Sequence, residues 1–247
     1  MPSLSDWTKS QVDRLGDRLR EGDISDDDLR LLDSYRRSFT DAYENVVGRI
    51  RGELGLEPTG RPAKSTTSIT DKLKRESVRL SQMQDIAGCR LTVPDLKAQD
   101  EVVVQLNRLF DEVAIVDRRE HPSHGYRAVH VVAELGGKLI EIQVRTSLQH
   151  LWAEVSEKIS DVVDPEIKYG EGDKETLEML STMSEVSARL EKTEARLSEA
   201  HVARARQGEL PDAINEVLAE AHEQRQRVAE TLDRMADVIP REKRRKK

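Results

Sequence analysis

The sequence has 247 residues, of which 36% are hydrophobic and 35% are charged. This balance excludes a membrane-embedded protein, which needs long apolar runs, and a wholly disordered chain, which lacks core-forming residues. The single cysteine, Cys89, excludes an internal disulfide, and the net charge of −7 argues against a broad nucleic-acid-binding surface. Because no apolar targeting segment stands near the start, we expect a cytoplasmic protein with no membrane association.

Two helical segments are predicted first, over residues 5–20 and 24–53. Apolar residues recur at three- and four-residue steps along the second: Leu31, Leu32, Tyr35, Phe39, Tyr43, Val46, Val47 and Ile50. Glycine and proline then predict a loop over residues 55–67. After it, Ser68 is predicted to cap a short helix that carries Lys72.

Short β-branched runs next predict four strands, over residues 89–93, 113–118, 129–135 and 138–145. A helix over residues 95–110 separates the first two strands, and the Gly136-Gly137 pair predicts a hairpin between the last two. Another helix, over residues 147–160, follows the last strand. These elements predict an α+β fold, a mixed and mostly antiparallel β-sheet flanked by helices.

Helical patterns return in the C-terminal part of the chain. Met183, Leu190 and Leu197 are spaced by sevens, and a second helix is predicted from about Pro211 to Val238. The two helices could form an intramolecular hairpin, a dimer contact that makes a homo-oligomer, or a surface for a regulatory protein.

The predicted domain organisation has four parts. An N-terminal helical segment (residues 1–54) precedes the core (55–165), a helical hairpin (166–240) and a basic tail (241–247). The tail holds six basic residues and one acidic residue, so it could contact RNA or a membrane surface, or it could be a solvated tail.

Polar residues alternate along the last predicted strand of the core. Glu141, Gln143 and Arg145 share one face of that strand, and Asp85 stands just before the first strand. Two carboxylates on neighbouring strands would suit Mg²⁺, which takes one or two protein carboxylates and fills its other positions with water and phosphate oxygens. A metal site therefore implies a phosphate substrate. The alternative is that this strand face is simply solvated.

Basic residues and one aromatic residue add to this pattern. Cations lie in or beside the segment before the first strand: Arg61, Lys64, Lys72, Arg75 and Arg90. Positioned cations are what phosphoryl transfer requires of a protein. In the later loop HPSHGYRAVH, Gly125 allows a sharp turn that would expose Tyr126 for stacking on a purine, with His130 on the same side. A plain surface tyrosine is the alternative.

Five segments in order between residues 61 and 155 resemble the motifs of the RelA/SpoT synthetase domain, and specifically the stand-alone small alarmone synthetases: RPAKSTTSITDKLKR, DIAGCR, HGYRAVH, EIQVRT and LQHLWAEV. The resemblance implies a nucleotidyltransferase-like core and a GTP diphosphokinase activity of the stringent response. In that family the β,γ-pyrophosphate of ATP moves to the 3′-hydroxyl of GTP or GDP, giving the alarmones and AMP.

The resemblance also implies roles for individual residues. The residues that correspond to ATP-binding positions are Arg61, Lys64, Ser68, Lys72 and Arg90. Asp85 and Glu141 correspond to the carboxylates that hold Mg²⁺, and Glu141 would also orient or deprotonate the attacking hydroxyl. The acceptor nucleotide would be bound by Tyr126, His130, Gln143 and His150.

The acceptor loop departs from the family pattern. Pro122 stands where the family has a lysine four residues before the tyrosine, so the acceptor-phosphate cation is missing unless another residue supplies it, namely Arg118, Arg119 or Arg127. His124 and His150 replace other family residues in the acceptor motifs, and Pro62 replaces an arginine near the first ATP lysine. The acceptor therefore stays open among GDP, GTP, an adenosine nucleotide and tRNA.

Two alternative functions follow from these departures. A toxic small alarmone synthetase would make adenosine alarmones or pyrophosphorylate the 3′ CCA end of tRNA, and it would have an antitoxin partner. A catalytically inactive nucleotide sensor is the other alternative. The retention of both Asp85 and Glu141 argues against a sensor, because an inactive site has no physical need for two clustered carboxylates beside phosphates.

Overall fold

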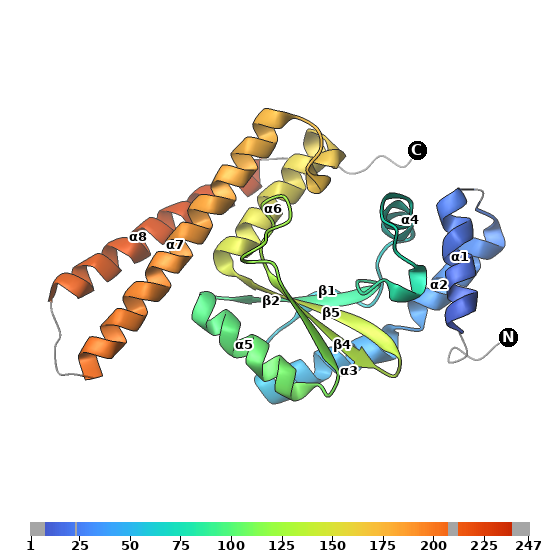
Figure 1. Ribbon diagram of the computed structural model, residues 1–247, viewed down its shortest axis with the longest axis horizontal. Coiled ribbons are helices and arrows are strands. Elements are labelled where there is room, and N and C mark those ends of the chain that lie inside the picture. The colour runs from blue at the N-terminus through green and yellow to red at the C-terminus, as the bar shows by residue number, and fades with distance from the viewer. Residues whose placement is uncertain (1–7, 23, 207–211, 239–247) are drawn as a thin grey trace. The chain divides into compact units, whose positions relative to one another are not determined.

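The computed structural model describes residues 8–22, 24–206 and 212–238 (Figure 1). The predicted basic tail lies outside these residues. The described residues divide into two compact units, and the first contains those within Met1–Leu91, Val103–Val116 and His130–Gln143. The second contains those within Thr92–Val102, Asp117–Val129 and Val144–Lys247. The four-part division expected from the sequence stays a prediction.

The first unit begins with three helices, α1 (Lys9–Glu21), α2 (Asp26–Arg37) and α3 (Thr40–Arg49), and a π-helical turn, Ile50–Leu54. The prediction of one continuous helix over residues 24–53 was wrong. The hydroxyl of Ser38 donates to the carbonyl of Tyr35 at 2.6 Å, at the point where α2 ends. A serine that bonds the backbone locally competes with the helical ladder, and the chain restarts as α3.

The segment before the sheet differs from its predicted form in two ways. A short strand, β1 (Thr59–Arg61), lies inside the predicted loop and pairs antiparallel with the next strand. The helix α4 (Thr66–Arg75) is capped by Ser65, whose hydroxyl accepts from the Ser68 amide, so the predicted Ser68 cap was wrong. A 3₁₀ turn, Leu80–Gln82, follows.

The remaining strands are β2 (Ala87–Val93), β3 (Val113–Asp117), β4 (Val129–Leu135) and β5 (Lys138–Thr146), with α5 (Leu96–Leu109) after β2. In the described residues the five strands form one sheet in the order β1-β2-β5-β4-β3. Backbone bonds from Glu134 to Glu112 and from Arg118 to Ala128 make the β3–β4 pair antiparallel. The α+β prediction is confirmed.

The predicted hairpin between β4 and β5 is also confirmed. Gly136 and Gly137 form its turn with φ angles of 55° and 73°. Two consecutive positive φ angles are what a type I′ turn requires, and glycine adopts them without steric cost. This turn sets β4 beside β5, the two strands that carry His130 and Glu141.

The second unit is built on helices. Thr146 caps α6 (Ser147–Val162) with a capping box, a 3₁₀ turn (Pro165–Tyr169) follows, and α7 (Lys174–Arg206) and α8 (Asp212–Val238) run side by side (Figure 1). Both pack on α6 around an apolar cluster that includes Trp152, Leu180 and Leu232. Within the described parts of the chain, no helix combines the length and apolarity that a bilayer crossing needs.

Candidate active site

A first cluster, in the first unit, centres on Asp85, which closely precedes β2. Lys64 Nζ donates to Asp85 Oδ2 at 2.5 Å, and Lys72 Nζ donates to Asp85 Oδ1 at 3.0 Å. All three side chains are mostly buried. One carboxylate between two ammonium groups leaves an excess positive charge, which suits a phosphate-binding site.

The backbone around Lys64 is fixed on both sides. Its amide donates to the carbonyl of Ile86 at 2.6 Å, and its carbonyl accepts from Arg36 Nε of α2 at 2.6 Å. Ser68 and Lys72 lie four residues apart on α4 and therefore share one face of that helix. The segment from Lys64 through α4 thus presents two lysines to Asp85.

Asp85 is ionised at neutral pH. Burial by itself raises the pKa of its carboxyl, but the charges and hydrogen bonds of Lys64 and Lys72 outweigh burial and hold that pKa below its ordinary value. Both lysines bond the carboxylate as donors. The two lysines together carry one more positive charge than the Asp85 carboxylate neutralises.

A second cluster in the same unit surrounds Glu141 on β5. His130 Nδ1, from β4, lies 2.9 Å from Glu141 Oε1, and Gln143 Nε2 donates to Glu141 Oε2 at 2.7 Å. The bond from Gln143 confirms that these two residues share a strand face. Both oxygens of the carboxylate are therefore oriented by neighbouring side chains. His130 and Gln143, which we expected at the acceptor, contact Glu141 itself.

The two carboxylates interact electrostatically. Burial raises the pKa of the Glu141 carboxyl and the charge of Asp85 raises it further, while the interactions with His130 and Gln143 lower it. The lowering effects win, so the pKa of Glu141 lies below its ordinary value. Glu141 therefore stays ionised at neutral pH although it is mostly buried.

The donor set of these clusters can be compared with what metal ions require. In the described residues, no group of three or more His, Cys, Asp or Glu side chains could hold a metal ion. A protein-enclosed metal cage is thus not built there. Mg²⁺ has a smaller requirement, because it takes one or two protein carboxylates and completes its shell with water and phosphate oxygens, and Asp85 and Glu141 are carboxylates of the kind that it takes.

Two predicted ATP-binding arginines lie on the paired strands β1 and β2. Arg61 ends β1 opposite Gly88, and Arg90 on β2 stands opposite Thr59. Arg61 is exposed and Arg90 is half-buried. β1 is the outermost strand beside β2, and Asp85 closely precedes β2 in the chain, so both arginines lie on the two strands nearest to the Asp85 segment in sequence.

A third cluster, in the second unit, contains Tyr126. His124 and Gly125 have φ angles of 51° and 85° and turn the chain just before it. Arg145 Nη2 donates to the Tyr126 hydroxyl at 3.0 Å, and the guanidinium lies over the ring, 4.9 Å from its centroid. The predicted turn is present, and Tyr126 is half-buried rather than fully exposed. His150 lies in the same unit, on α6.

The three arginines of the acceptor loop have different surroundings. Arg119 is bonded by Asp100 at 2.7 Å and by Asp117 at 2.6 Å, and Arg127 donates to the hydroxyl of Ser184. The side chain of Arg118 has no hydrogen bond or ion pair within the described residues, and its buried Nε has no partner there. Arg118 therefore differs from Arg119 and Arg127, whose side chains have partners in the described residues.

Sequence reasoning gave no site role to two contributors to these clusters, Arg145 and Arg36. Arg145 had a detectable signal, because it continues the alternation of Glu141 and Gln143 along β5, but its contact with Tyr126 could not be foreseen. Arg36 had no signal, since an arginine on an amphipathic helix is normally solvated. Its bond to the Lys64 carbonyl is a tertiary contact.

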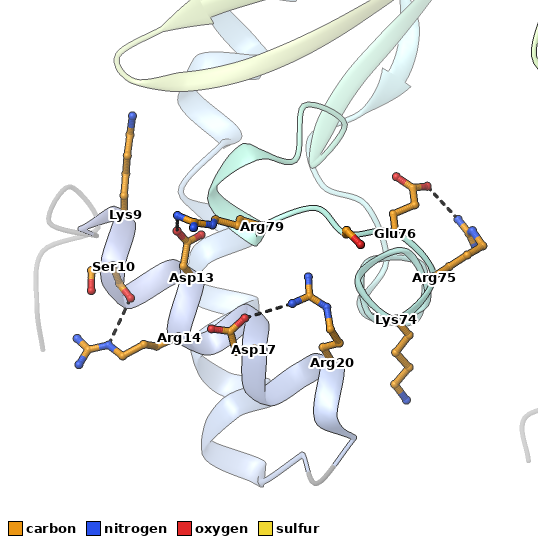
Figure 2. A pocket seen from close by; sticks show the side chains of 11 residues that line it. Lys9, Ser10, Asp13, Arg14, Asp17, Arg20, Lys74, Arg75, Glu76 and Arg79 are labelled. Carbon is orange, nitrogen blue, oxygen red and sulfur yellow. Dashed lines mark hydrogen bonds and ion pairs between the residues drawn. The ribbon is translucent and has the colours of Figure 1, made fainter.

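A groove of about 740 Å³ lies elsewhere in the first unit, between α1 and the end of α4 (Figure 2). Some charged side chains that line it form ion pairs with one another: Arg20 pairs with Asp17, and Arg79 pairs with Asp13. Lys9, Arg14 and Lys74 extend in different directions from it (Figure 2). These cations do not converge on one point, and the chemistry of the site lies in the carboxylate clusters instead.

The family described as "Region found in RelA / SpoT proteins" matches residues 60–160. The uncharacterized protein Rv1366 of Mycobacterium tuberculosis is 36% identical over 173 residues, which cover 67% of this chain and 63% of that protein. GTP pyrophosphokinase YjbM of Bacillus subtilis is 33% identical over 119 residues, covering 41% of this chain and 54% of that enzyme.

The fold is similar to that of a solved structure, small alarmone synthetase 1 from Bacillus subtilis. The TM-score is 0.51 with 24% sequence identity, and the match covers 71% of this chain and 98% of the other. The same protein has been solved bound to its product pppGpp. The family match contains the Lys64–Asp85 pair, Tyr126 and Glu141. Residues 60–160 of this chain therefore match the region that RelA and SpoT proteins share.

Proposed function

We propose that this chain is a nucleotide pyrophosphokinase of the cytoplasm that transfers the β,γ-pyrophosphate of ATP to the 3′-hydroxyl of GTP or GDP, as in the stringent response. The observation that carries the proposal is the buried Asp85 carboxylate between Lys64 and Lys72, in the same unit as the buried, oriented carboxylate of Glu141. Support for a guanosine acceptor comes from relatives named GTP pyrophosphokinase and from the pppGpp-bound structure.

On the ATP side, Lys64 and Lys72 bind the phosphates. A triphosphate carries more negative charge than a single carboxylate. The ammonium groups of both lysines can therefore leave the Asp85 carboxylate and bind phosphate oxygens, and each lysine keeps an anionic partner. Ser68 shares the α4 face of Lys72 and contributes to the same site. Arg61 and Arg90 complete the ATP-binding set from the β1–β2 edge.

We propose Mg²⁺ as the cofactor, held by Asp85 and Glu141. When bound, the ion would neutralise charge on the transferring phosphates. The exchange of lysines from carboxylate to phosphate would leave Asp85 free to take up this role.

In the transfer itself, the 3′-oxygen of the acceptor forms a bond to the β-phosphorus of ATP. The bond between that phosphorus and the oxygen bridging to the α-phosphate breaks, and AMP leaves. Glu141 accepts the hydrogen bond of the attacking hydroxyl and takes its proton, while His130 and Gln143 keep the carboxylate oriented. Its low pKa makes Glu141 a weak base, so its main contribution is to position the hydroxyl.

On the acceptor side, Tyr126 stacks on the base while Arg145 supports the ring. Arg118 supplies the acceptor-phosphate cation that Pro122 cannot, because Arg119 and Arg127 are already engaged. His150 is the candidate to contact the base.

The deciding experiment incubates the protein with γ-labelled ATP and, separately, GDP, GTP, ATP and deacylated tRNA. Labelled product from GDP or GTP is expected, and an Asp85→Asn variant should abolish it. Label on tRNA alone, reduced by truncation after Pro240, would replace this proposal by the toxin alternative. A folded protein that labels none of the acceptors would favour the inactive sensor.

A further inference from the structure

A cavity of about 750 Å³ lies in the second unit and is separate from the residues assigned above. Its walls are the first turns of α5, residues 119 and 120 after β3, one face of α7 and two residues of α8. The volume lies within the range of about 300–1,000 Å³ that is typical of small-molecule sites.

Two carboxylates on α7 line this cavity although they are almost completely buried. Glu191 is 4% exposed and Glu194 is 7% exposed. Oε2 of Glu194 and Nε of Arg225 form an ion pair at 3.3 Å, and both that Nε and the second oxygen, Glu194 Oε1, are buried without a hydrogen-bond partner among the described residues. Buried carboxylate oxygens normally accept a hydrogen bond. A ligand in the cavity could supply the hydrogen-bond donor that Glu194 Oε1 lacks.

The charge balance of the lining points to the same kind of ligand. It contains seven carboxylates against four lysine or arginine side chains. Each of these four cations already has a carboxylate partner: Lys97 with Glu101, Arg119 with Asp100, Lys192 with Glu120 and Arg225 with Glu194. Burial also raises the pKa of the Glu191 and Glu194 carboxyls. The cavity is therefore short of positive charge and disfavours anions such as nucleotides.

The position of Glu191 is fixed by a buried polar network. Its carboxylate accepts from the hydroxyl of Thr146, and Gln149 Nε2 lies 3.5 Å from its second oxygen. Gln149 is bonded in turn to Gln99, which contacts Arg119 of the cavity wall. A rigid acidic wall of this kind is preorganised for a cation.

The cavity also has an aliphatic surface. Leu96 on α5 and Ala195 and Val202 on α7 line it beside the carboxylates. A hydrated metal ion would gain nothing from these side chains, whereas a ligand with methylene groups between charged nitrogens would bury them there.

We propose that this cavity binds an aliphatic polyamine, with an ammonium group on Glu194 and the methylene chain against Leu96, Ala195 and Val202. The proposal does not depend on the pyrophosphokinase activity. The ammonium group supplies the donor that Glu194 Oε1 lacks and offsets the excess acidic charge of the wall.

Spermidine is the probe, and binding is measured by isothermal titration calorimetry and by the shift in Tm of the full chain without nucleotides. Spermidine should raise Tm in a saturable way, whereas KCl at equal ionic strength and 1,8-octanediol should not. Glu194→Gln should weaken binding about tenfold or more, because it removes a charge-assisted hydrogen bond. Glu178→Gln, an exposed change on α7 outside the cavity, should leave binding within about twofold.

A second variant keeps every charge but fills the cavity. Ala195→Leu should abolish spermidine binding while the protein stays folded by circular dichroism. If spermidine acts no differently from salt at equal ionic strength, or if both Glu194→Gln and Ala195→Leu bind it as tightly as the unaltered chain, the proposal is wrong.

Discussion

Gly88 on β2 packs so closely against Glu141 on β5 that a β-carbon at Gly88 would lie 2.6 Å from the Glu141 carbonyl oxygen. Gly88→Ala must therefore displace the backbone that carries the candidate base. We expect a loss of about 1–3 kcal/mol in the free energy of unfolding, as for overpacked cores, and a larger relative loss of transfer rate. Urea unfolding and the labelled-ATP assay measure the two effects.

The matched control is Gly48→Ala. A β-carbon at Gly48, in α3, would meet nothing within 4 Å. This change should stabilise the protein by about 0.4–1 kcal/mol and leave the transfer rate unchanged. Equal activity in both alanine variants would contradict the close-packing argument.

The carboxylate pair should be essential for transfer. Asp85→Asn or Glu141→Gln removes one charge with little change in shape, and the rate should fall on the order of 10²- to 10⁴-fold. Asp111→Asn, an exposed acid of the same unit, should retain full activity. Near-normal rates in either test variant would remove the metal assignment, provided circular dichroism shows an intact fold.

The buried carboxyl of Glu191 predicts a pH dependence of stability. Burial raises its pKa above the unfolded value of 4.5, so the folded state binds the proton more tightly. Its contribution to stability should therefore grow as pH falls from neutral towards about 4.5. As pH falls from 7 to about 4.5, the free energy of unfolding of the unaltered chain should therefore rise relative to that of Glu191→Gln.

The stability contributions of Asp85 and Glu141 change with pH in the direction opposite to that of Glu191, because the pKa values of these two carboxyls are lowered in the folded state. Their contribution is present above the unfolded pKa values of 3.8 and 4.5 and is lost as pH falls through the folded ones. Urea unfolding between pH 7 and 4.5 therefore reports on Glu191 with little interference from this pair. A difference from Glu191→Gln that stays constant with pH would refute the burial argument.

Tyr126 variants separate its ring from its hydroxyl. Tyr126→Ala removes base stacking, which contributes roughly 1–3 kcal/mol, so KM for the acceptor should rise about tenfold or more at saturating ATP. Tyr126→Phe keeps the ring but removes the acceptor of the Arg145 bond. It should lower stability by about 1 kcal/mol while KM for the acceptor changes by about threefold or less. A large KM effect from Tyr126→Phe would shift recognition from the ring to the hydroxyl.

Arg118 should bind the acceptor phosphates. Arg118→Gln should raise KM for GTP or GDP about tenfold, since a charge-assisted contact to phosphate is lost, and should leave KM for ATP unchanged. Arg108→Gln, an exposed change on α5, is the control and should alter neither constant. If KM for ATP rises instead, Arg118 serves the donor, and the acceptor cation must be sought elsewhere.

Much of the fold follows from local sequence patterns. The β-branched runs predicted the strands β2 to β5, and the Gly136-Gly137 pair predicted the hairpin between β4 and β5. Both predictions succeed because side-chain alternation and permitted φ angles are properties of short segments. The ordered motifs between residues 61 and 155 predicted the family, which the match over residues 60–160 confirms. Side-chain alternation also placed Glu141 and Gln143 on one face.

Local patterns could not choose the helix cap before α4. Ser65, Thr66, Thr67 and Ser68 can all cap helices, so the sequence alone offers four starting points. The two tertiary backbone bonds of Lys64 fix the segment that leads to Ser65, and Ser65 becomes the cap.

The pairings within the site were decided only by the tertiary structure. The contacts of Asp85 with two lysines, and of Glu141 with His130, join residues from different elements. The same holds for the contacts that engage Arg119 and Arg127. Such contacts depend on strand order and on how helices pack. An interaction between two charges that are far apart in the sequence imposes no periodic pattern on the residues between them, so the sequence alone does not reveal it.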